Sequence, residues 1–140
     1  MAHAKVTLTE GMKFKVDTGS GHELTVDARE EVGGTDGGPR PMELLAAGLA
    51  GCTAMDVISI LRKMQQPVQG LEVRVATKDA EAHPRRFLSM HIEYEITGEG
   101  LDEARVRRAI ELSESRYCPA TATLRQGTTV TSSYRIVAPQ

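Results

Sequence analysis

The chain has 140 residues, of which 40% are hydrophobic and 26% charged, and its formal net charge is -2 at pH 7. This length and composition indicate a single globular domain, residues 1–140, that buries its core without the help of disulfides. A mildly acidic balance with 4% aromatic residues and no tryptophan argues against nucleic acid or an anionic membrane surface as a partner.

The first residues, MAHAKVTLTEG, alternate polar and apolar side chains and do not resemble a signal peptide. No uninterrupted apolar run approaches the roughly 20 residues that cross a bilayer. The chain has two cysteines, Cys52 and Cys118. We therefore expect a cytoplasmic, reducing location, where a cysteine pair is more often catalytic, redox-active or metal-binding than structural.

Three strands are expected at the start of the chain because polar and apolar residues alternate there. They cover residues 4–9, 12–17 and 22–28. A loop rich in glycine and proline, GGTDGGPRP at residues 33–41, follows the third strand.

A long helix is expected to begin at Pro41, since proline is favoured at the first helical position. It should end at about Gln65, because Pro67 and Gly70 lie just beyond. The helix is apolar around most of its circumference, which predicts a core helix that is wrapped by other elements or by a partner subunit.

The second half of the chain alternates again and then becomes helical. The expected elements are strands at 71–80 and 87–97 joined by a hairpin loop, a helix capped by Asp102 that runs to about Arg116, a short helix after Cys118-Pro119, and a last strand at 128–137. This order predicts an α+β fold with antiparallel sheet rather than βαβ winding.

Cys52 lies inside the long helix, in GLAGCTAMDVISIL. A buried free cysteine often serves only as a small hydrophobic residue. Gly48 and Gly51, however, lie within one turn of the thiol, and a helical glycine costs about 1 kcal/mol relative to alanine. That cost indicates close approach of another backbone or a ligand. Asp56, one turn later, would raise the thiol pKa unless a cation pairs with it.

Cys118 precedes a proline in SRYCPATATL, which predicts that it caps the short helix that follows. Unpaired backbone N–H groups and the helix dipole at that position favour a thiolate, and Arg116 and Arg125 lie near in sequence. The alternative is that Cys118-Pro119 only separates two helices.

Metal ligation has little support, because His3, His22, His83 and His91 show no paired spacing with the two cysteines. We expect these histidines on strand surfaces or in loops. No metal and no cofactor is therefore expected.

GLAGCTAMDVISIL after GGPRPMELLAA, followed later by YCPATATL, resembles the OsmC/Ohr family of peroxide-detoxifying proteins. The resemblance covers nearly the whole chain, and the paired motifs are more specific than either cysteine alone. It implies an OsmC-like fold, in which antiparallel sheets wrap around a long central cysteine-bearing helix in an intertwined homodimer with active sites at the subunit interface.

The resemblance also implies a reaction. Cys52 would attack an organic hydroperoxide and become a sulfenic acid, and Cys118 would then resolve it to a Cys52–Cys118 disulfide. A dithiol reductant, a lipoylated protein in members of the family, would restore both thiols.

Two further site residues are expected from the same resemblance. In Ohr-type peroxidases an arginine from the N-terminal strands and a glutamate at the start of the cysteine helix support the thiolate. The first arginine here is Arg29, so we name Arg40, which directly precedes the helix. Glu43 is separated from Pro41 by one residue more than in the family, which rotates its side chain by about 100°; it is also a plausible first-turn acidic residue.

Two other functions compete with the peroxidase. The first is a small-molecule binding or redox-sensing module on the same dimeric fold, which the missing N-terminal arginine favours. The second is a cysteine acyltransferase or hydrolase, which needs a histidine base beside Cys52. No histidine stands in such a place in the sequence, so this function ranks last.

Overall fold

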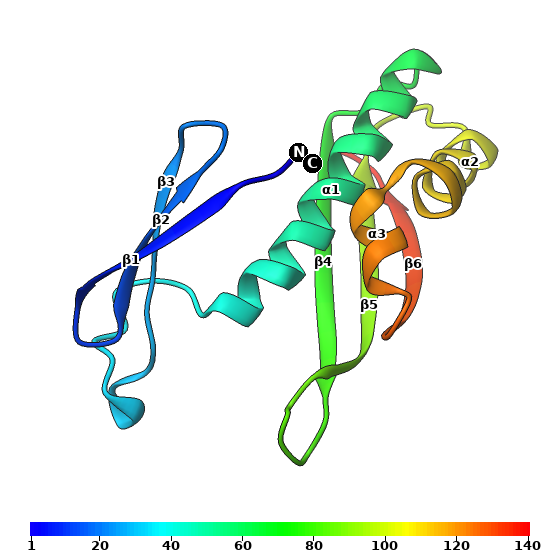
Figure 1. Cartoon of the computed structure of the whole chain (residues 1–140). Coiled ribbons are helices and arrows are strands. Elements are labelled where there is room, and N and C mark those ends of the chain that lie inside the picture. The colour runs from blue at the N-terminus through cyan, green and yellow to red at the C-terminus, as the bar shows by residue number, and fades with distance from the viewer. The chain divides into compact units, whose positions relative to one another are not determined.

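The computed structural model describes all 140 residues, Met1–Gln140. They form two compact units, Met1–Leu45 and Ala46–Gln140. The long helix α1 (Pro41–Lys63) belongs in part to each unit (Figure 1). The expected single domain stays a prediction.

The first unit is an antiparallel sheet of three strands, in the order β1-β2-β3. The strands are β1 (Ala4–Glu10), β2 (Lys13–Thr18) and β3 (Glu23–Val26). All three predicted strands are confirmed to within two residues at each end. Gly11, with φ +52°, makes the turn between the first two, a conformation that glycine adopts without strain.

This sheet has one charged face and one apolar face. The register places Val6 opposite Val16 and Leu8 opposite Phe14. Alternation puts these side chains on one face. Val6 and Leu8 remain 54% and 57% exposed, so the chain itself leaves much of the apolar face uncovered.

A buried carboxylate anchors the loop between β3 and α1. Asp27 accepts hydrogen bonds from the backbone N–H groups of Ala28, Thr35 and Gly37 and from the Thr35 hydroxyl, at 2.7–3.2 Å. The Gly37 N–H, and then the Ala28 N–H, lower the pKa of Asp27 to about 2. The carboxylate thus ties the loop that leads into α1 back to the end of β3.

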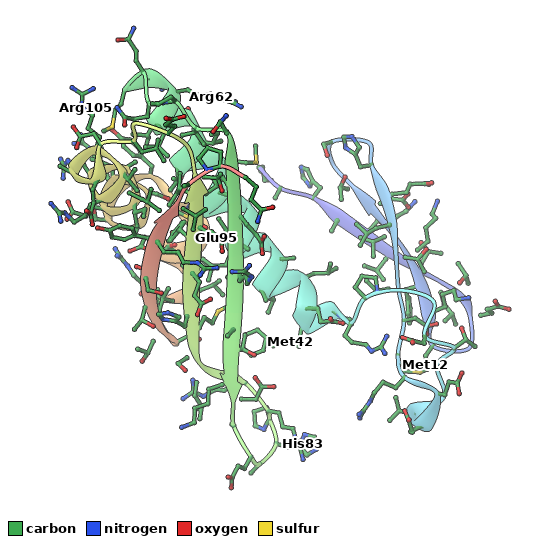
Figure 2. The ribbon with its side chains drawn as sticks, turned by 180° about the vertical axis from the view of Figure 1, so that it is seen from behind. Met12, Met42, Arg62, His83, Glu95 and Arg105 are labelled. Atoms are coloured by element: carbon green, nitrogen blue, oxygen red, sulfur yellow. The ribbon has the colours of Figure 1, made fainter.

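The second unit contains the remaining strands and helices. They are β4 (Gly70–Asp79), β5 (Phe87–Thr97), α2 (Glu103–Leu112), a π-helical turn η2 (Ser113–Tyr117), α3 (Pro119–Leu124) and β6 (Thr129–Val137). The sheet order is β4-β5-β6. The predicted hairpin of β4 and β5 is confirmed, and His83 lies in its loop (Figure 2).

The α+β class is confirmed, but the expectation of purely antiparallel sheet is wrong for one pair. Strand β6 runs parallel to β5, from Ser89 opposite Thr129 to Thr97 opposite Val137. The reason is the helical segment between them, which returns the chain to the end of the sheet where β5 began. Parallel neighbours need such a crossover connection.

The core of the second unit lies between its sheet and its helices, which cover one face of that sheet (Figure 1). It joins α1, β5 and α2 through fully buried side chains such as Leu61, Ile92 and Val106. The other face is polar, and Glu95 lies there between Arg74 and Arg135 (Figure 2).

Helix α1 begins at Pro41 as predicted and ends at Lys63, two residues before the expected end. Gln65 has φ +57°, a left-handed conformation that commonly ends helices. The buried stripe of the helix is Leu49, Thr53, Val57 and Leu61. By length and composition alone α1 would pass for a membrane-crossing helix, a test that core helices also pass.

Asp102 caps α2 as predicted, accepting from the N–H groups of Ala104 and Arg105. The regular helix ends at Leu112, earlier than the expected Arg116, because η2 replaces its last turn. Short π-helical turns occur frequently at functional sites. Here the turn directly precedes Cys118.

Candidate functional site

The fold brings the two cysteines together within the second unit. Both are free thiols; Cys118 is buried, at 3% exposed, and Cys52 is half-buried. The Cys118 side chain lies near enough to Cys52 to raise the pKa of the Cys52 thiol. The two thiols are therefore neighbours in the fold, and a disulfide between them stays a prediction.

Cys118 is the N-cap of α3, as its position before Pro119 predicted. Its Sγ accepts from the backbone N–H of Thr121 at 3.4 Å. Its own N–H donates to the carbonyl of Ser113 at 2.7 Å. These two contacts fix the thiol between η2 and α3.

Cys52 has surroundings that oppose its ionisation. Burial raises the pKa of the Cys52 thiol above its usual value, and the Cys118 thiol and the Asp56 carboxylate raise it further. The backbone N–H of Ala120 acts in the opposite direction. The expectation that Asp56 would raise this pKa is confirmed.

Asp56 accepts a hydrogen bond from the Ser113 hydroxyl at 3.2 Å. Ser113 is fully buried at the start of η2. The partner of Asp56 in this chain is thus an uncharged hydroxyl.

Arg40 and Glu43 form a local cluster at the start of α1, in the first unit. The Arg40 guanidinium pairs with Asp36 at 2.7 Å and donates to the carbonyl of Gly38 at 2.9 Å. Glu43 accepts from the backbone N–H of Arg40 at 2.8 Å. Glu43 therefore acts as a cap for the first turn of α1, and a role for either residue at the thiols stays a prediction.

Sequence reasoning did not identify the polar side chains that surround η2. Tyr94 on β5 is 1% exposed, and its hydroxyl donates to Glu114 at 3.1 Å. Burial raises the pKa of Tyr94, and the Glu114 charge adds to that rise. A buried tyrosine in an alternating strand was a visible signal, but its partner 20 residues later was not.

His91 has a structural environment on the polar face of the second sheet. Its Nδ1 lies 2.6 Å from the Thr131 hydroxyl and its Nε2 lies 3.0 Å from the Ser133 hydroxyl. The prediction that the histidines occupy strands or loops is confirmed for His91 and His83. No group of three or more His, Cys, Asp or Glu side chains is arranged to hold a metal ion.

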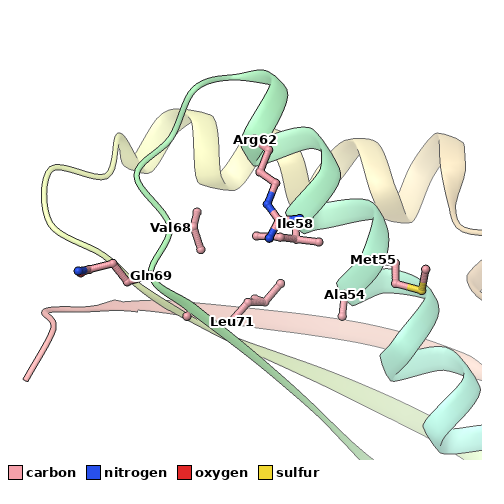
Figure 3. A pocket seen from close by; sticks show the side chains of 8 residues that line it. Ala54, Met55, Ile58, Arg62, Val68, Gln69 and Leu71 are labelled. Carbon is pink, nitrogen blue, oxygen red and sulfur yellow. The ribbon is translucent and has the colours of Figure 1, made fainter.

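An open cleft lies beside α1 in the second unit (Figure 3). Its volume is about 370 Å³. The lining residues are Ala54, Met55, Ile58, Arg62, Val68, Gln69, Gly70 and Leu71. Arg62 is the one charged side chain among them, so the cleft would suit an apolar molecule with an anionic group.

Comparison with known proteins gives both sequence relatives and structural neighbours. Protein YhfA of Escherichia coli K12 is 36% identical over 135 residues, which cover 96% of this chain and 98% of that protein. A hypothetical protein from Aquifex aeolicus is 26% identical, with a TM-score of 0.86 over 100% of this chain and 98% of that chain.

An organic hydroperoxide resistance protein OsmC from Legionella pneumophila is 22% identical, with a TM-score of 0.65 over 96% of each chain. At that identity the likeness is evidence for the fold alone. The family model described as OsmC-like protein matches residues 34–133, which include both cysteines. The chain belongs to the OsmC-like protein family, as the two cysteine motifs indicated.

Proposed function

We propose that the chain is a thiol-dependent peroxidase that reduces organic hydroperoxides to alcohols. The observation that carries the proposal is the meeting of Cys52, half-buried on α1, with Cys118, buried at the start of α3. A sulfenic acid on Cys52 would then have the Cys118 thiol beside it as the group that resolves it.

The reaction has three steps. The Cys52 thiolate attacks the distal oxygen of ROOH and the O–O bond breaks. The alkoxide takes up a proton from solvent and leaves as ROH, and Cys52 becomes a sulfenic acid. The Cys118 sulfur then displaces the hydroxyl as water and forms the Cys52–Cys118 disulfide. An external dithiol, such as a lipoylated protein, reduces this disulfide by exchange and becomes oxidised itself.

The first step needs a thiolate, and burial together with Asp56 works against one. The proposal therefore includes a cationic group in the assembled protein. Arg40 is the side chain that we assign to this role, and Glu43, which accepts from the Arg40 backbone N–H, supports it from the first turn of α1. A reducing, cytoplasmic location also forms part of the proposal, because the last step consumes thiols.

A consumption assay tests the proposal directly. Wild-type protein with cumene hydroperoxide and a dithiol should turn over, and Cys52→Ser should lose nearly all activity. Cys118→Ser should react once and then stop at the sulfenic acid, which mass spectrometry detects as one added oxygen. Equal turnover by the wild type and Cys52→Ser would reject the peroxidase.

The cleft beside α1 favours a second candidate, a small-molecule binding or sensing module on the same fold. A volume of about 370 Å³ falls in the range of small-molecule sites, roughly 300–1,000 Å³. The raised pKa of Cys52 also fits a site in which the thiols are not essential. Native mass spectrometry should then find a retained ligand that survives serine at both cysteine positions.

We further propose that two chains associate as a homodimer. Val6 and Leu8 on β1 and Met55 on α1 are 54%, 57% and 73% exposed, although all three are large and apolar. Exposed apolar groups in such number support a surface that a partner covers. A second copy is the partner that the family resemblance implies.

A further inference from the structure

The π-helical turn η2 connects α2 to Cys118 and is held from two sides. Ser113 and Glu114 begin this turn, and their side chains reach in different directions. Since the turn ends at the residue before Cys118, any shift of η2 also moves the Cys118 sulfur.

The sheet holds η2 through the carboxylate of Glu114. One oxygen accepts from the Tyr94 hydroxyl on β5 at 3.1 Å, and the other accepts from the Ser132 hydroxyl on β6 at 3.0 Å. Tyr94 is 1% exposed, so its bond is shielded from water. Hydrogen bonds to a charged acceptor are stronger than neutral ones.

Helix α1 holds η2 through Ser113. The Ser113 hydroxyl donates to Asp56, one turn from Cys52, at 3.2 Å. Its carbonyl accepts from the N–H of Cys118 at 2.7 Å. Ser113 therefore links the helix of one cysteine to the backbone of the other.

We propose that Glu114 and Ser113 are positioning residues that hold Cys118 against Cys52 and so favour the disulfide between them. The inference rests on the proposed function for its catalytic meaning, because the disulfide is the second step of that reaction. Its physical basis is effective concentration: groups held in the right geometry react far more readily than free ones.

The test uses glutathione, so that no hydroperoxide is involved. Protein equilibrates with mixtures of reduced and oxidised glutathione; two protein thiols become one disulfide as one oxidised glutathione becomes two reduced ones. The fraction of Cys52–Cys118 disulfide, measured by mass spectrometry after acid quenching, gives the effective concentration of the pair.

Glu114→Ala removes both contacts to the sheet, and we expect the effective concentration to fall about tenfold or more. Glu114→Gln keeps an acceptor for Tyr94 and a donor toward Ser132, so it should restore most of the value. Glu111→Ala is the matched control, because this exposed glutamate pairs with Arg108 on α2 and has no hydrogen bond to the sheet.

If Glu114 only stabilised the fold in general, its removal would change Cys52 reactivity and disulfide formation together. Alkylation of Cys52 by iodoacetamide in Glu114→Ala should stay within about threefold of the wild type, although its disulfide is destabilised about tenfold. If Glu114→Ala does not fold, Ser132→Ala removes one of the two contacts at an exposed position and should lower the effective concentration by about threefold.

Two outcomes would overturn the inference, and they differ in meaning. If the wild type forms the disulfide and the Glu114 and Ser132 variants have the same effective concentration as Glu111→Ala, the positioning role fails. The peroxidase proposal then stands. If the wild type forms no Cys52–Cys118 disulfide in any glutathione mixture, the proposed function fails and this inference fails with it.

Discussion

Cys52 shows how the surroundings of one sulfur atom decide whether it can act as a nucleophile. The thiolate is the reactive form, and burial is the main reason that its pKa is raised here. Cys118 and Asp56 contribute smaller effects of the same sign. The chain therefore places a second thiol near Cys52 but also opposes a negative charge on the Cys52 sulfur.

Replacing Asp56 separates the effect of charge from the effect of burial. Asp56→Asn keeps an oxygen that can accept from Ser113 but removes the negative charge near Cys52. We expect the pKa of Cys52 to fall, so that iodoacetamide alkylation at pH 7 becomes about twofold to fivefold faster. The alkylation rate measured from pH 6 to pH 10 gives the pH at which half of the Cys52 thiol is ionised.

Asp79→Asn is the control for this measurement, because Asp79 is an exposed residue that accepts from Thr77 at the end of β4. It should leave the alkylation profile of Cys52 unchanged. If the Cys52 alkylation rate of Asp56→Asn has its midpoint at the same pH as in the wild type, or at a higher pH, the electrostatic role of Asp56 is contradicted.

At the scale of elements, much of the fold follows from local patterns. Alternation predicted β1 and β5 to within two residues, and Asp102 and Cys118 were identified as helix caps from their neighbours alone. These predictions succeed because the interactions are local: a strand pattern has period two, and a cap bonds to N–H groups two or three residues later.

The features that were missed depend on contacts between distant residues. The direction of β6 is set by the crossover from β5, not by the TTVTSSYRIV sequence. The bond from Tyr94 to Glu114 joins a strand to a turn that no residue type marks as π-helical. Glu43 is a different case, because its partner, the backbone N–H of Arg40, is only three residues away, and its catalytic role stays a prediction.

The loop before α1 gives a prediction with a definite pH dependence. The pKa of Asp27 is about 2 in the folded chain, against about 3.9 for a free aspartate. Because the folded value is the lower one, the ionised carboxylate stabilises the fold fully above pH 4–5. That contribution is lost as the pH falls toward 2.

Asp27→Asn should therefore lower the melting temperature at pH 7, and the difference from the wild type should shrink between pH 4 and pH 2. Thermal unfolding followed by circular dichroism at several pH values measures it. Asp79→Asn, which alters an exposed carboxylate, should show a smaller difference. If the difference in melting temperature between the wild type and Asp27→Asn stays constant down to pH 2, Asp27 does not stabilise the loop through its charge.

At the scale of the whole molecule, the surface of α1 bears most directly on the proposed homodimer. The sequence predicted a helix wrapped on all sides, yet the chain buries Leu49, Thr53, Val57 and Leu61 along one stripe only. A methyl group added at Gly48 or Gly51 would meet nothing within 4 Å beyond the surrounding turns of its own helix. Nothing in the chain explains why glycine stands at these two positions.

Gly51→Ala decides between an open helix surface and a dimer contact. If water alone faces Gly51, alanine should stabilise the chain by about 1 kcal/mol through its helix propensity. We expect the opposite, because the methyl group would separate two closely packed backbones in the proposed homodimer. The dimer dissociation constant should rise at least about tenfold, in line with the cost of overpacking a contact.

Sedimentation velocity over a concentration series measures that constant, and urea unfolding of the same samples records the stability of the fold. Gly127→Ala serves as the control, since a methyl group there also has nothing within 4 Å and Gly127 lies in the turn between α3 and β6. If Gly51→Ala is more stable than the wild type and its dimer dissociation constant is unchanged, α1 does not lie in the dimer interface. The apolar face of the first sheet would then be the remaining candidate surface for a partner.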